Sequence, residues 1–431
     1  MFKNTQNNIY LSLFDEIKRI FNKNKPNSKS KYESKLLSGN YNDLHDINIA
    51  YVLKGFPTLS QTFVLNELRY LVENNYNVVV FCYEDPTNLV GLDFDIEVIR
   101  FDAKDFDINN LSNINSKEYK SKNPNPEYIK DNEILLSNLE ELLISYKIDL
   151  IHTHFVYPPA TFYTYPICEK LQIPFTVFAH AADIFKYAVD KINKVGEISQ
   201  SKYCKAIFTL SNYHKNYLME RNVPEEKIIL TRQATEYKIS ELKMRSENVR
   251  KIVAISRFVE KKGIDVLIDA ADILKDEDFE FSIYGFGALE NKYKKQINSL
   301  GLENISVKGL LNGPEEVKKV FEKSDLLVAP CKIAKSGDRD GIPTVLFEAM
   351  AYGVNVLTTS VSAIPEVINN NENGFIIEPD DAEALASKIK EISQLSSEER
   401  FNIAKKAQED VQNISSVEKT VNTLLETWMN K

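Results

Sequence analysis

The sequence has few cysteines, no long apolar run and no excess of positive charge, and each shortage excludes a class of protein. The four cysteines lie far apart, with neither the paired spacing of a zinc site nor the density of a disulfide framework. No apolar stretch approaches the roughly 20 residues that span a bilayer, and the first residues lack the pattern of a secretory signal. We therefore expect a cytoplasmic protein without a membrane-spanning segment.

The charge balance excludes a second group of functions. The chain carries 53 Lys and Arg against 62 Asp and Glu, a formal net charge of −9. A protein that coats nucleic acid or membrane needs a broadly positive surface, which this composition does not supply. We expect no nucleic-acid partner, and any anion-binding site must be local.

The length and the hydrophobic pattern predict two domains of the same kind. With 431 residues, of which 43% are hydrophobic, the chain is long enough for two ordinary cores. From Ile47, strand-like segments such as NIAYVL and VVVFCYE alternate with helical ones, and the rhythm restarts at KIVAISRF. This alternation predicts an α/β fold of two doubly wound domains, over residues 47–235 and 236–395. Helices over residues 396–431 are expected to cross back and pack on the first domain.

Residues 1–46 differ from the rest of the chain. Residues 10–21 carry apolar side chains at helical spacing with lysine and arginine beside them, and an Asn, Lys and Ser-rich stretch that indicates a linker follows. Two interpretations stay open. Residues 1–25 can form a helix at the inner membrane surface, as a peripheral contact, or a helix that packs on the body of the protein.

The segment SGDRDGIPTVLFEAMAYG is the most informative part of the chain. It places Asp340 and Glu348 seven residues apart, and we predict a helix that begins near Ile342 or Pro343. Asp340 then lies just before the helix and Glu348 about two turns inside it. Gly341 allows a ligand to approach the backbone closely, and the free N–H groups of the helix start face an anion. This geometry suits a diphosphate.

A second segment, ISRFVEKKGIDVLIDA, predicts a pair of cations at a strand-to-helix turn. Arg257 and Lys262 flank the turn, which ends at Gly263. Two cations there can neutralise the charge that develops on a departing nucleotide diphosphate, a task that a metal ion performs in other transferases. We therefore expect no metal cofactor. The alternative is a solvated turn with Lys261 as an ordinary surface lysine.

Three histidines lie on or directly after predicted strands. His180, in FAHAADIF, stands at the C-terminal end of one strand, where ligands of open α/β sheets collect, although a lone histidine can also be structural. His152 and His154, in IHTHF, point to the same side of another strand. No third ligand has a recognisable metal-site spacing, so we favour a structural or cleft-lining role for this pair over metal binding.

Together these segments resemble glycosyltransferase family 4, the retaining enzymes with two facing Rossmann-like domains known as the GT-B fold. The resemblance covers about residues 47–395 and implies roles for the catalytic candidates. It implies sugar contacts for Asp340 and His180, a ribose contact for Glu348, and charge stabilisation by Arg257 and Lys262.

The resemblance also implies the rest of the donor pocket and a loop on the acceptor side. The expected donor-binding residues are Gly285, Gly309, Leu310, Gly341, Ile342, Pro343, Thr344 and Glu348. Gly309 and Leu310 match the turn that binds the base in that family. The acceptor-side loop follows the first strand and contains Gly55, Phe56, Ser60 and Gln61, for which an ordinary helix start is the alternative.

The resemblance predicts a retaining, metal-independent hexosyltransferase that requires no cofactor. The donor is expected to be a nucleotide-diphosphate sugar, with UDP favoured over GDP, and the acceptor a glycan or lipid-linked saccharide in cell-surface or exopolysaccharide assembly. The alternative is a catalytically silent nucleotide-sugar or glycan-binding protein of the same fold. A dinucleotide-dependent oxidoreductase is disfavoured because KGFPTLSQTF lacks the G-x-G-x-x-G pattern.

Overall fold

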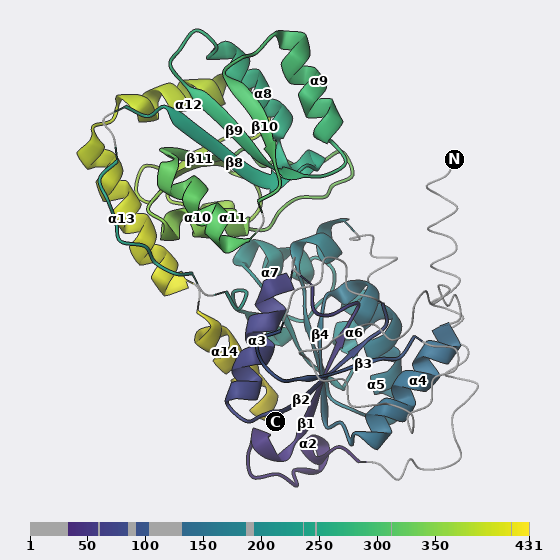
Figure 1. Ribbon diagram of the computed structural model, residues 1–431. Helices are drawn as coiled ribbons and strands as arrows, with labels where there is room; N and C mark the ends of the chain where they lie inside the picture. Colours follow the sequence, from purple (N-terminus) through teal and green to yellow (C-terminus); the bar gives the residue numbers. More distant parts are fainter. Residues whose placement is uncertain are drawn as a thin grey trace, which may run out of the picture. The chain divides into compact units, whose positions relative to one another are not determined.

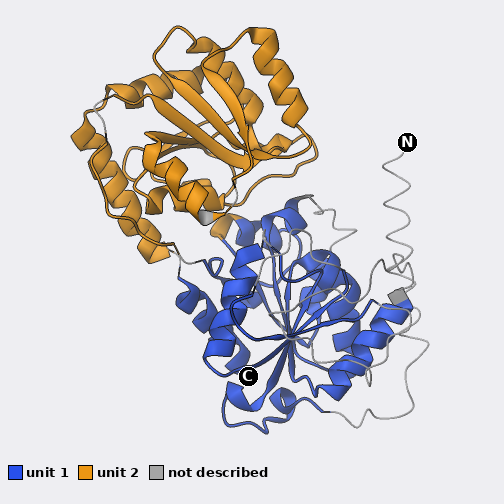
Figure 2. Cartoon of the chain, in the orientation of Figure 1, with its two compact units in different colours: residues 1–210, 214–235, 416–431 blue, residues 211–213, 236–415 orange. Residues whose placement is uncertain are grey.

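The structure, a computed structural model, divides into two compact units (Figure 2). The first unit comprises Met1–Leu210, His214–Thr235 and Ser416–Lys431, and the second Ser211–Tyr213 and Glu236–Ser415. The residues that the structure describes are 33–58, 61–84, 92–102, 132–186, 194–235, 237–245, 248–311, 313–414 and 416–430.

The first unit is built on a seven-stranded parallel sheet with the order β3-β2-β1-β4-β5-β6-β7. Its strands are nearly continuous apolar runs because helices cover the sheet on both faces, and all five residues of β4 are buried. The strands are β1 (Asn48–Leu53), β2 (Asn77–Cys82), β3 (Glu97–Arg100), β4 (Leu150–His154), β5 (Phe175–Phe178), β6 (Cys204–Thr209) and β7 (Ile228–Leu230).

Amphipathic helices connect these strands (Figure 1). In α3, for example, Val64, Leu68 and Leu71 recur at helical spacing and are fully buried. The α-helices of the first unit are α2 (Lys35–Ser38), α3 (Thr62–Glu73), α4 (Asn132–Ser145), α5 (Tyr165–Leu171), α6 (Val195–Gln200), α7 (Asn212–Met219, whose first two residues cluster with the second unit) and α14 (Val417–Met429). The 3-10 helices are η1 (Leu44–Asp46) and η7 (Glu225–Lys227), and the π-helices are η5 (Val156–Thr164) and η6 (Ala182–Lys186).

The second unit contains a six-stranded parallel sheet with the order β10-β9-β8-β11-β12-β13. Neighbouring residues of β8 belong to different apolar clusters, Ile252 to one and Val253 to the other, so both faces of the sheet carry a core. The strands are β8 (Lys251–Arg257), β9 (Glu280–Phe286), β10 (Ile305–Gly309), β11 (Leu326–Ala329), β12 (Asn355–Thr359) and β13 (Phe375–Ile377). The helices are η8 (Glu260–Lys262), α8 (Ile264–Ile273), α9 (Glu290–Leu300), α10 (Pro314–Lys323), α11 (Thr344–Ala351), η9 (Ile364–Glu366), α12 (Ala382–Gln394) and α13 (Ser397–Ile414).

The strand order of each sheet reverses beside the first strand of its unit. The reversal lies between β1 and β4 in the first unit and between β8 and β11 in the second. Parallel strands end at the same edge of a sheet, and ligands of open α/β sheets bind at the carboxyl ends beside such a reversal. The loops that follow β8 and β11 carry Lys262 and Asp340, so the predicted chemistry falls where this fold binds ligands.

The prediction of a linker up to residue 46 is wrong for the described residues. Ser34 donates a hydrogen bond from its Oγ to the carbonyl oxygen of Asp149 at 2.7 Å, and Leu44 is 2% exposed within the first core. A segment with so few apolar residues docks mainly through such hydrogen bonds, which its local pattern does not show. Residues 1–25, the predicted amphipathic segment, lie outside the described residues.

The predicted return of the chain to the first unit is confirmed, but it begins later than expected. The last helix, α14, packs against α3 (Figure 1). It buries Trp428, whose Nε1 donates to Thr176 Oγ1 at 3.1 Å. The preceding α13 instead places Ala407 and Val411 in a core of the second unit. The prediction that residues 396–415 pack on the first domain is therefore wrong. Among the described residues, none of the helices combines the length and the apolarity that a membrane span requires.

Candidate active site

The cation-bearing turn of the second unit follows β8 and depends on a glycine. Lys262 ends the short helix η8, and Gly263 follows with φ +63°. A Cβ at Gly263 would lie 1.8 Å from the carbonyl oxygen of Pro330, so no other residue fits without a shift of the backbone. This close approach holds the turn against the loop that follows β11.

An ion pair joins the two loops. Lys262 Nζ lies 2.6 Å from Asp340 Oδ2, and the two side chains are only 14% and 12% exposed. Burial opposes ionisation of both groups, but the attraction of Lys262 and Lys261 holds the pKa of Asp340 below its usual value. Asp340 likewise raises the pKa of Lys262 against the effect of burial. Both groups are therefore charged at neutral pH.

Lys261 and Asp338 extend this pair into a cluster. Lys261 Nζ lies 2.9 Å from Asp338 Oδ1 and 3.4 Å from Asp340 Oδ1, and its side chain is 4% exposed. The alternative that Lys261 is an ordinary surface lysine is therefore wrong. The sequence contained a signal for this arrangement, because two adjacent lysines at one turn are matched by the Asp-x-Asp spacing of Asp338 and Asp340 in the facing loop.

Arg257 and Glu348 are two further charged residues of the second unit that the sequence singled out. Arg257 is exposed at the carboxyl end of β8, and its guanidinium makes no hydrogen bond or ion pair within the part of the chain that the structure describes. Glu348 is half-buried on α11, and burial raises the pKa of its carboxyl. The helix begins at Thr344 with Pro343 as its N-cap, slightly later than predicted, so Glu348 lies in the second turn.

The remaining donor-pocket candidates differ in what holds them in place. Gly285 has φ +142°, and a Cβ there would lie 1.8 Å from the carbonyl oxygen of Ser256 on β8. The pairing of β8 with β9 therefore explains this glycine without a ligand. Gly309 ends β10, and the following Leu310 is 54% exposed, which leaves an apolar side chain available beside a turn of main-chain groups. Gly341 is buried and Ile342 half-buried directly before α11.

The loop after β1 in the first unit is only partly available to a ligand. Phe56 is 1% exposed and belongs to the core, so its side chain does not face solvent. Thr58 donates to the carbonyl oxygen of Gly55 at 3.3 Å and closes the turn. Gln61 is half-buried at the N-cap of α3 without a side-chain capping bond. Ser60 lies outside the described residues.

His180 follows β5 and is joined to other buried polar groups of the first unit. It is 4% exposed, and its Nε2 lies 3.0 Å from His154 Nδ1. His154 Nε2 in turn lies 2.8 Å from Glu67 Oε2. Burial lowers the pKa of His180 well below its usual value, and the neighbouring histidines add to this effect. His180 is therefore neutral at pH 7.

Glu67 lies beside His152 and His154 and is a third potential metal ligand, which the sequence did not indicate. Each of the three residues offers one possible metal-ligand atom, these atoms lie within 4.8 Å of one another, and all three residues are buried. Glu67 comes from α3, 87 positions before His154, so no local spacing could show it. Because Glu67 and His154 already bond to each other, we interpret the group as a hydrogen-bonded cluster.

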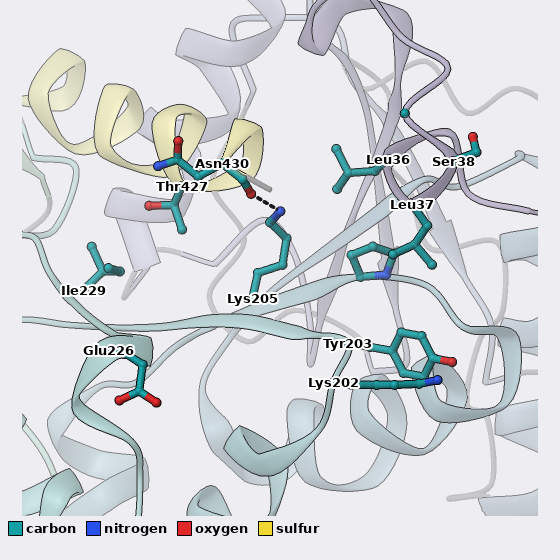
Figure 3. A pocket seen from close by; sticks show the side chains of 12 residues that line it. Leu36, Leu37, Ser38, Lys202, Tyr203, Lys205, Glu226, Ile229, Thr427 and Asn430 are labelled. Atoms are coloured by element: carbon teal, nitrogen blue, oxygen red, sulfur yellow. Dashed lines mark hydrogen bonds between the residues drawn. The ribbon is translucent and has the colours of Figure 1, made fainter.

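A separate cavity of about 610 Å³ lies in the first unit (Figure 3). It lies where β5 and β6 begin, next to α2 and the end of α14, and its polar groups include Lys202, Lys205 and Glu226. Lys205 Nζ reaches the carbonyl oxygen of Asn430 across it at 2.5 Å. The cavity therefore lies at the amino ends of the strands, opposite the edge where doubly wound sheets bind ligands.

Two family profiles match the chain. The profile described as Glycosyltransferase Family 4 matches residues 60–233, and that described as Glycosyl transferases group 1 matches residues 238–410. The two matches meet within a few residues of the boundary between the units at Thr235.

Several named proteins are similar to the chain. The amylovoran biosynthesis glycosyltransferase AmsK of Erwinia amylovora is 32% identical over 57% of this chain and 61% of its own length. The putative colanic acid biosynthesis glycosyltransferase WcaL of Escherichia coli is 31% identical over 47% of this chain and 51% of its own. The chain thus matches between half and three fifths of the length of these relatives.

Solved structures show the same fold at lower identity. A glycosyltransferase from Rickettsia africae aligns with a TM-score of 0.63 over 90% of this chain and 98% of its own, at 22% identity. The Anabaena protein HepE, in complex with UDP and glucose, aligns with a TM-score of 0.67 over 89% of this chain and 100% of its own, at 16% identity. These similarities establish the two-domain parallel-sheet architecture.

Proposed function

Since the chain belongs to the family 4 glycosyltransferases of the GT-B fold, we propose that it transfers a sugar from a nucleotide-diphosphate sugar to a saccharide acceptor. The observation that carries the proposal is the cluster of Lys262, Asp340, Lys261 and Asp338 at the strand-order reversal of the second unit. A merely structural turn does not require buried charges at the ligand-binding edge of a sheet.

The charged groups of the second unit take different roles towards the nucleotide-sugar donor. The exposed guanidinium of Arg257 and the N–H groups at the start of α11 attract the diphosphate. As the bond between sugar and phosphate breaks, negative charge grows on the leaving diphosphate, and Lys262 stabilises it. Asp340 is held ionised by the two lysines, so it accepts hydrogen bonds from hydroxyl groups of the sugar.

Metal independence is part of the proposal. Asp338 and Asp340 have a spacing that could bind a divalent cation, but both carboxylates are paired with lysine ammonium groups. Those cations supply the positive charge that a metal would bring to the diphosphate.

The donor, the acceptor and the cellular setting are the finer parts of the proposal. We favour a hexose carried by UDP, which the UDP and glucose bound to HepE support. The similarity to AmsK and WcaL supports an acceptor in cell-surface or exopolysaccharide assembly, either a glycan or a lipid-linked saccharide. Residues 1–25 would then add a peripheral contact with the membrane in which a lipid-linked acceptor lies.

A screen of nucleotide sugars tests the proposal. We expect at least one UDP-hexose to raise the thermal midpoint of the protein and to be hydrolysed slowly without acceptor, with release of UDP. A binding protein of the same fold would show the thermal shift without hydrolysis. Because Arg257 and Lys262 supply the positive charge that stabilises the leaving diphosphate, the hydrolysis rate in EDTA should stay within about twofold of the rate without EDTA.

Two results would count against parts of this proposal. Stabilisation without UDP release for every donor, in the presence of candidate acceptors, would favour the silent binding protein. Loss of turnover in EDTA with recovery in Mg²⁺ or Mn²⁺ would reject metal independence and leave the transferase proposal intact. Arg257→Ala serves as the negative control for hydrolysis, because it removes the exposed cation without touching a buried pair.

The product should keep the anomeric configuration of the donor. The proposal assigns no carboxylate as a general base that would activate the acceptor on the opposite face of the sugar, and the leaving phosphate is available to accept the proton on the same face. ¹H NMR of donor and early product distinguishes the two outcomes through the coupling constant of the anomeric proton. An inverted product would overturn this mechanism and the retaining assignment.

A further inference from the structure

Four polar side chains of the first unit form a hydrogen-bonded chain that begins at Glu67 on α3 and includes His180. Glu67 Oε2 lies 2.8 Å from His154 Nε2, His154 Nδ1 lies 3.0 Å from His180 Nε2, and Gln233 Nε2 lies 3.4 Å from His180 Nδ1. We propose that Glu67 and His154 are positioning residues that hold His180 in a single tautomer and make its Nδ1 an acceptor for a sugar hydroxyl. The hydroxyl part of this inference rests on the proposed function, whereas the tautomer part does not.

The proton positions follow from what each group can donate. An ionised Glu67 only accepts, so His154 must carry its proton on Nε2. His154 Nδ1 is then a lone pair, and the proton between the two histidines must belong to His180 Nε2. His180 Nδ1 is left as an acceptor, which agrees with the side-chain amide of Gln233 as its donor. One arrangement of protons fits all three of these bonds, whereas Glu67 Oε1 has no hydrogen-bond partner among the described residues.

The surroundings of the chain favour this single arrangement. Glu67 and His154 are fully buried, and burial lowers the pKa of His180 well below its usual value, so the His180 ring carries a single proton. Tyr51 donates a further hydrogen bond to Glu67 Oε2 at 3.3 Å, so this oxygen acts as an acceptor towards both Tyr51 and His154. In the other tautomer of His154, the lone pair of Nε2 would face Glu67 Oε2, and no proton would lie between these two acceptor atoms.

Ring packing holds the same geometry in place. The His180 ring stacks on Phe178 at 4.8 Å and lies 4.5 Å from the ring of Phe155. The backbone N–H of His180 also donates to Asp183 Oδ1 at 2.8 Å. Of the two bonds to its ring, the one from Gln233 is the longer, so a hydroxyl that donates a shorter bond can replace that amide. His180 then recognises a hydroxyl and not a carbonyl oxygen.

Two substitutions of His154 separate positioning from packing. His154→Phe keeps an aromatic ring against Phe178, which it stacks on at 5.3 Å, but removes both nitrogens. His154→Asn loses the ring, but its Oδ1 can accept the proton of His180 Nε2. We expect His154→Phe to lower kcat by about tenfold, with donor KM changed less than about threefold, and His154→Asn to retain more activity. A packing role predicts the opposite order.

A second measurement does not depend on turnover. Two-bond ¹H–¹⁵N spectra of ¹⁵N-histidine-labelled protein report the tautomer of each ring, and the chain has only five histidines to assign. His180 should carry its proton on Nε2 in the wild type and in His154→Asn, and should lose this single tautomer in His154→Phe. His45 is exposed, so the His45→Phe variant serves as the control and should leave the His180 signals unchanged.

The outcomes are distinguishable. A wild-type His180 protonated on Nδ1, or the same spectrum in His154→Phe, would overturn the inference whatever the enzyme assays show. A metal ion that co-purifies and is lost on His154→Phe would also overturn it, because the metal would occupy the nitrogen that bonds Glu67. If no donor is turned over, the proposed function fails, and the spectra still decide the tautomer.

Discussion

Lys262→Ala should lower kcat by roughly 10² or more at saturating donor, which is the scale expected when one preorganised charge partner of a transition state is removed. The substitution also leaves Asp340 with Lys261 as its remaining cation, at 3.4 Å in place of the 2.6 Å pair. The pKa of Asp340 should therefore rise, and the residual activity should decline more steeply towards acidic pH than that of the wild type. Initial rates of UDP release over a pH series measure both effects.

A matched lysine in the same unit provides the control. Lys295 is exposed on α9, away from the cluster, and Lys295→Ala should leave kcat within about twofold. Lys262→Arg keeps the charge but not the compact ammonium, so it should fall between the wild type and Lys262→Ala. A rate for Lys262→Ala equal to that of Lys295→Ala would remove Lys262 from the proposed mechanism.

Gly263→Ala should destabilise the second unit by about 2–6 kcal/mol. A left-handed backbone conformation costs an alanine about 1–3 kcal/mol, and forcing a methyl group into a filled space adds about 1–3 kcal/mol. Both terms apply at Gly263, which has φ +63° and would place Cβ 1.8 Å from the carbonyl oxygen of Pro330. Urea unfolding followed by circular dichroism measures the change as a lower midpoint of the transition.

Gly301 separates the two contributions to this destabilisation. It has nearly the same conformation, φ +65° at the C-cap of α9, but a Cβ there meets nothing within 4 Å. Gly301→Ala should therefore cost only the conformational part, about 1–3 kcal/mol. Equal losses in the two variants would show that the contact with Pro330 relaxes freely and does not hold the turn.

The fold was predictable because each strand has a recognisable apolar pattern within its own few residues. Segments such as KIVAISR are apolar and short, bounded by turn residues, and alternate with helical patterns, so the two sheets follow from one rhythm. The boundary at Thr235 lies where large apolar residues become rare. The division between α13 and α14 was not predictable, because both helices are amphipathic and only tertiary packing decides which core each one joins.

The candidate site was predictable only where each residue follows a strand. Arg257, Lys262 and Asp340 could be placed because the carboxyl ends of parallel strands meet at one edge. The burial of Lys261 was missed, because a charged side chain at a turn is normally solvated and the Asp-x-Asp spacing of the facing loop does not by itself show that Asp338 meets this lysine. The bond between Glu67 and His154 joins a helix and a strand far apart in the sequence, and no period within either segment indicates it.

The discontinuity of the first unit affects the order in which the protein can fold during synthesis. Residues 416–430, which supply Trp428 to the first core, leave the ribosome after every strand of the second unit. The second unit is continuous apart from three residues, so it can complete its core while the first unit still exposes the face of α3 on which α14 will pack. Strands β1 to β7 are therefore translated before the second unit, but their core is completed after it. Until α14 is made, the nascent first unit exposes apolar surface on α3, and exposed apolar surface of this kind is what chaperones bind during synthesis.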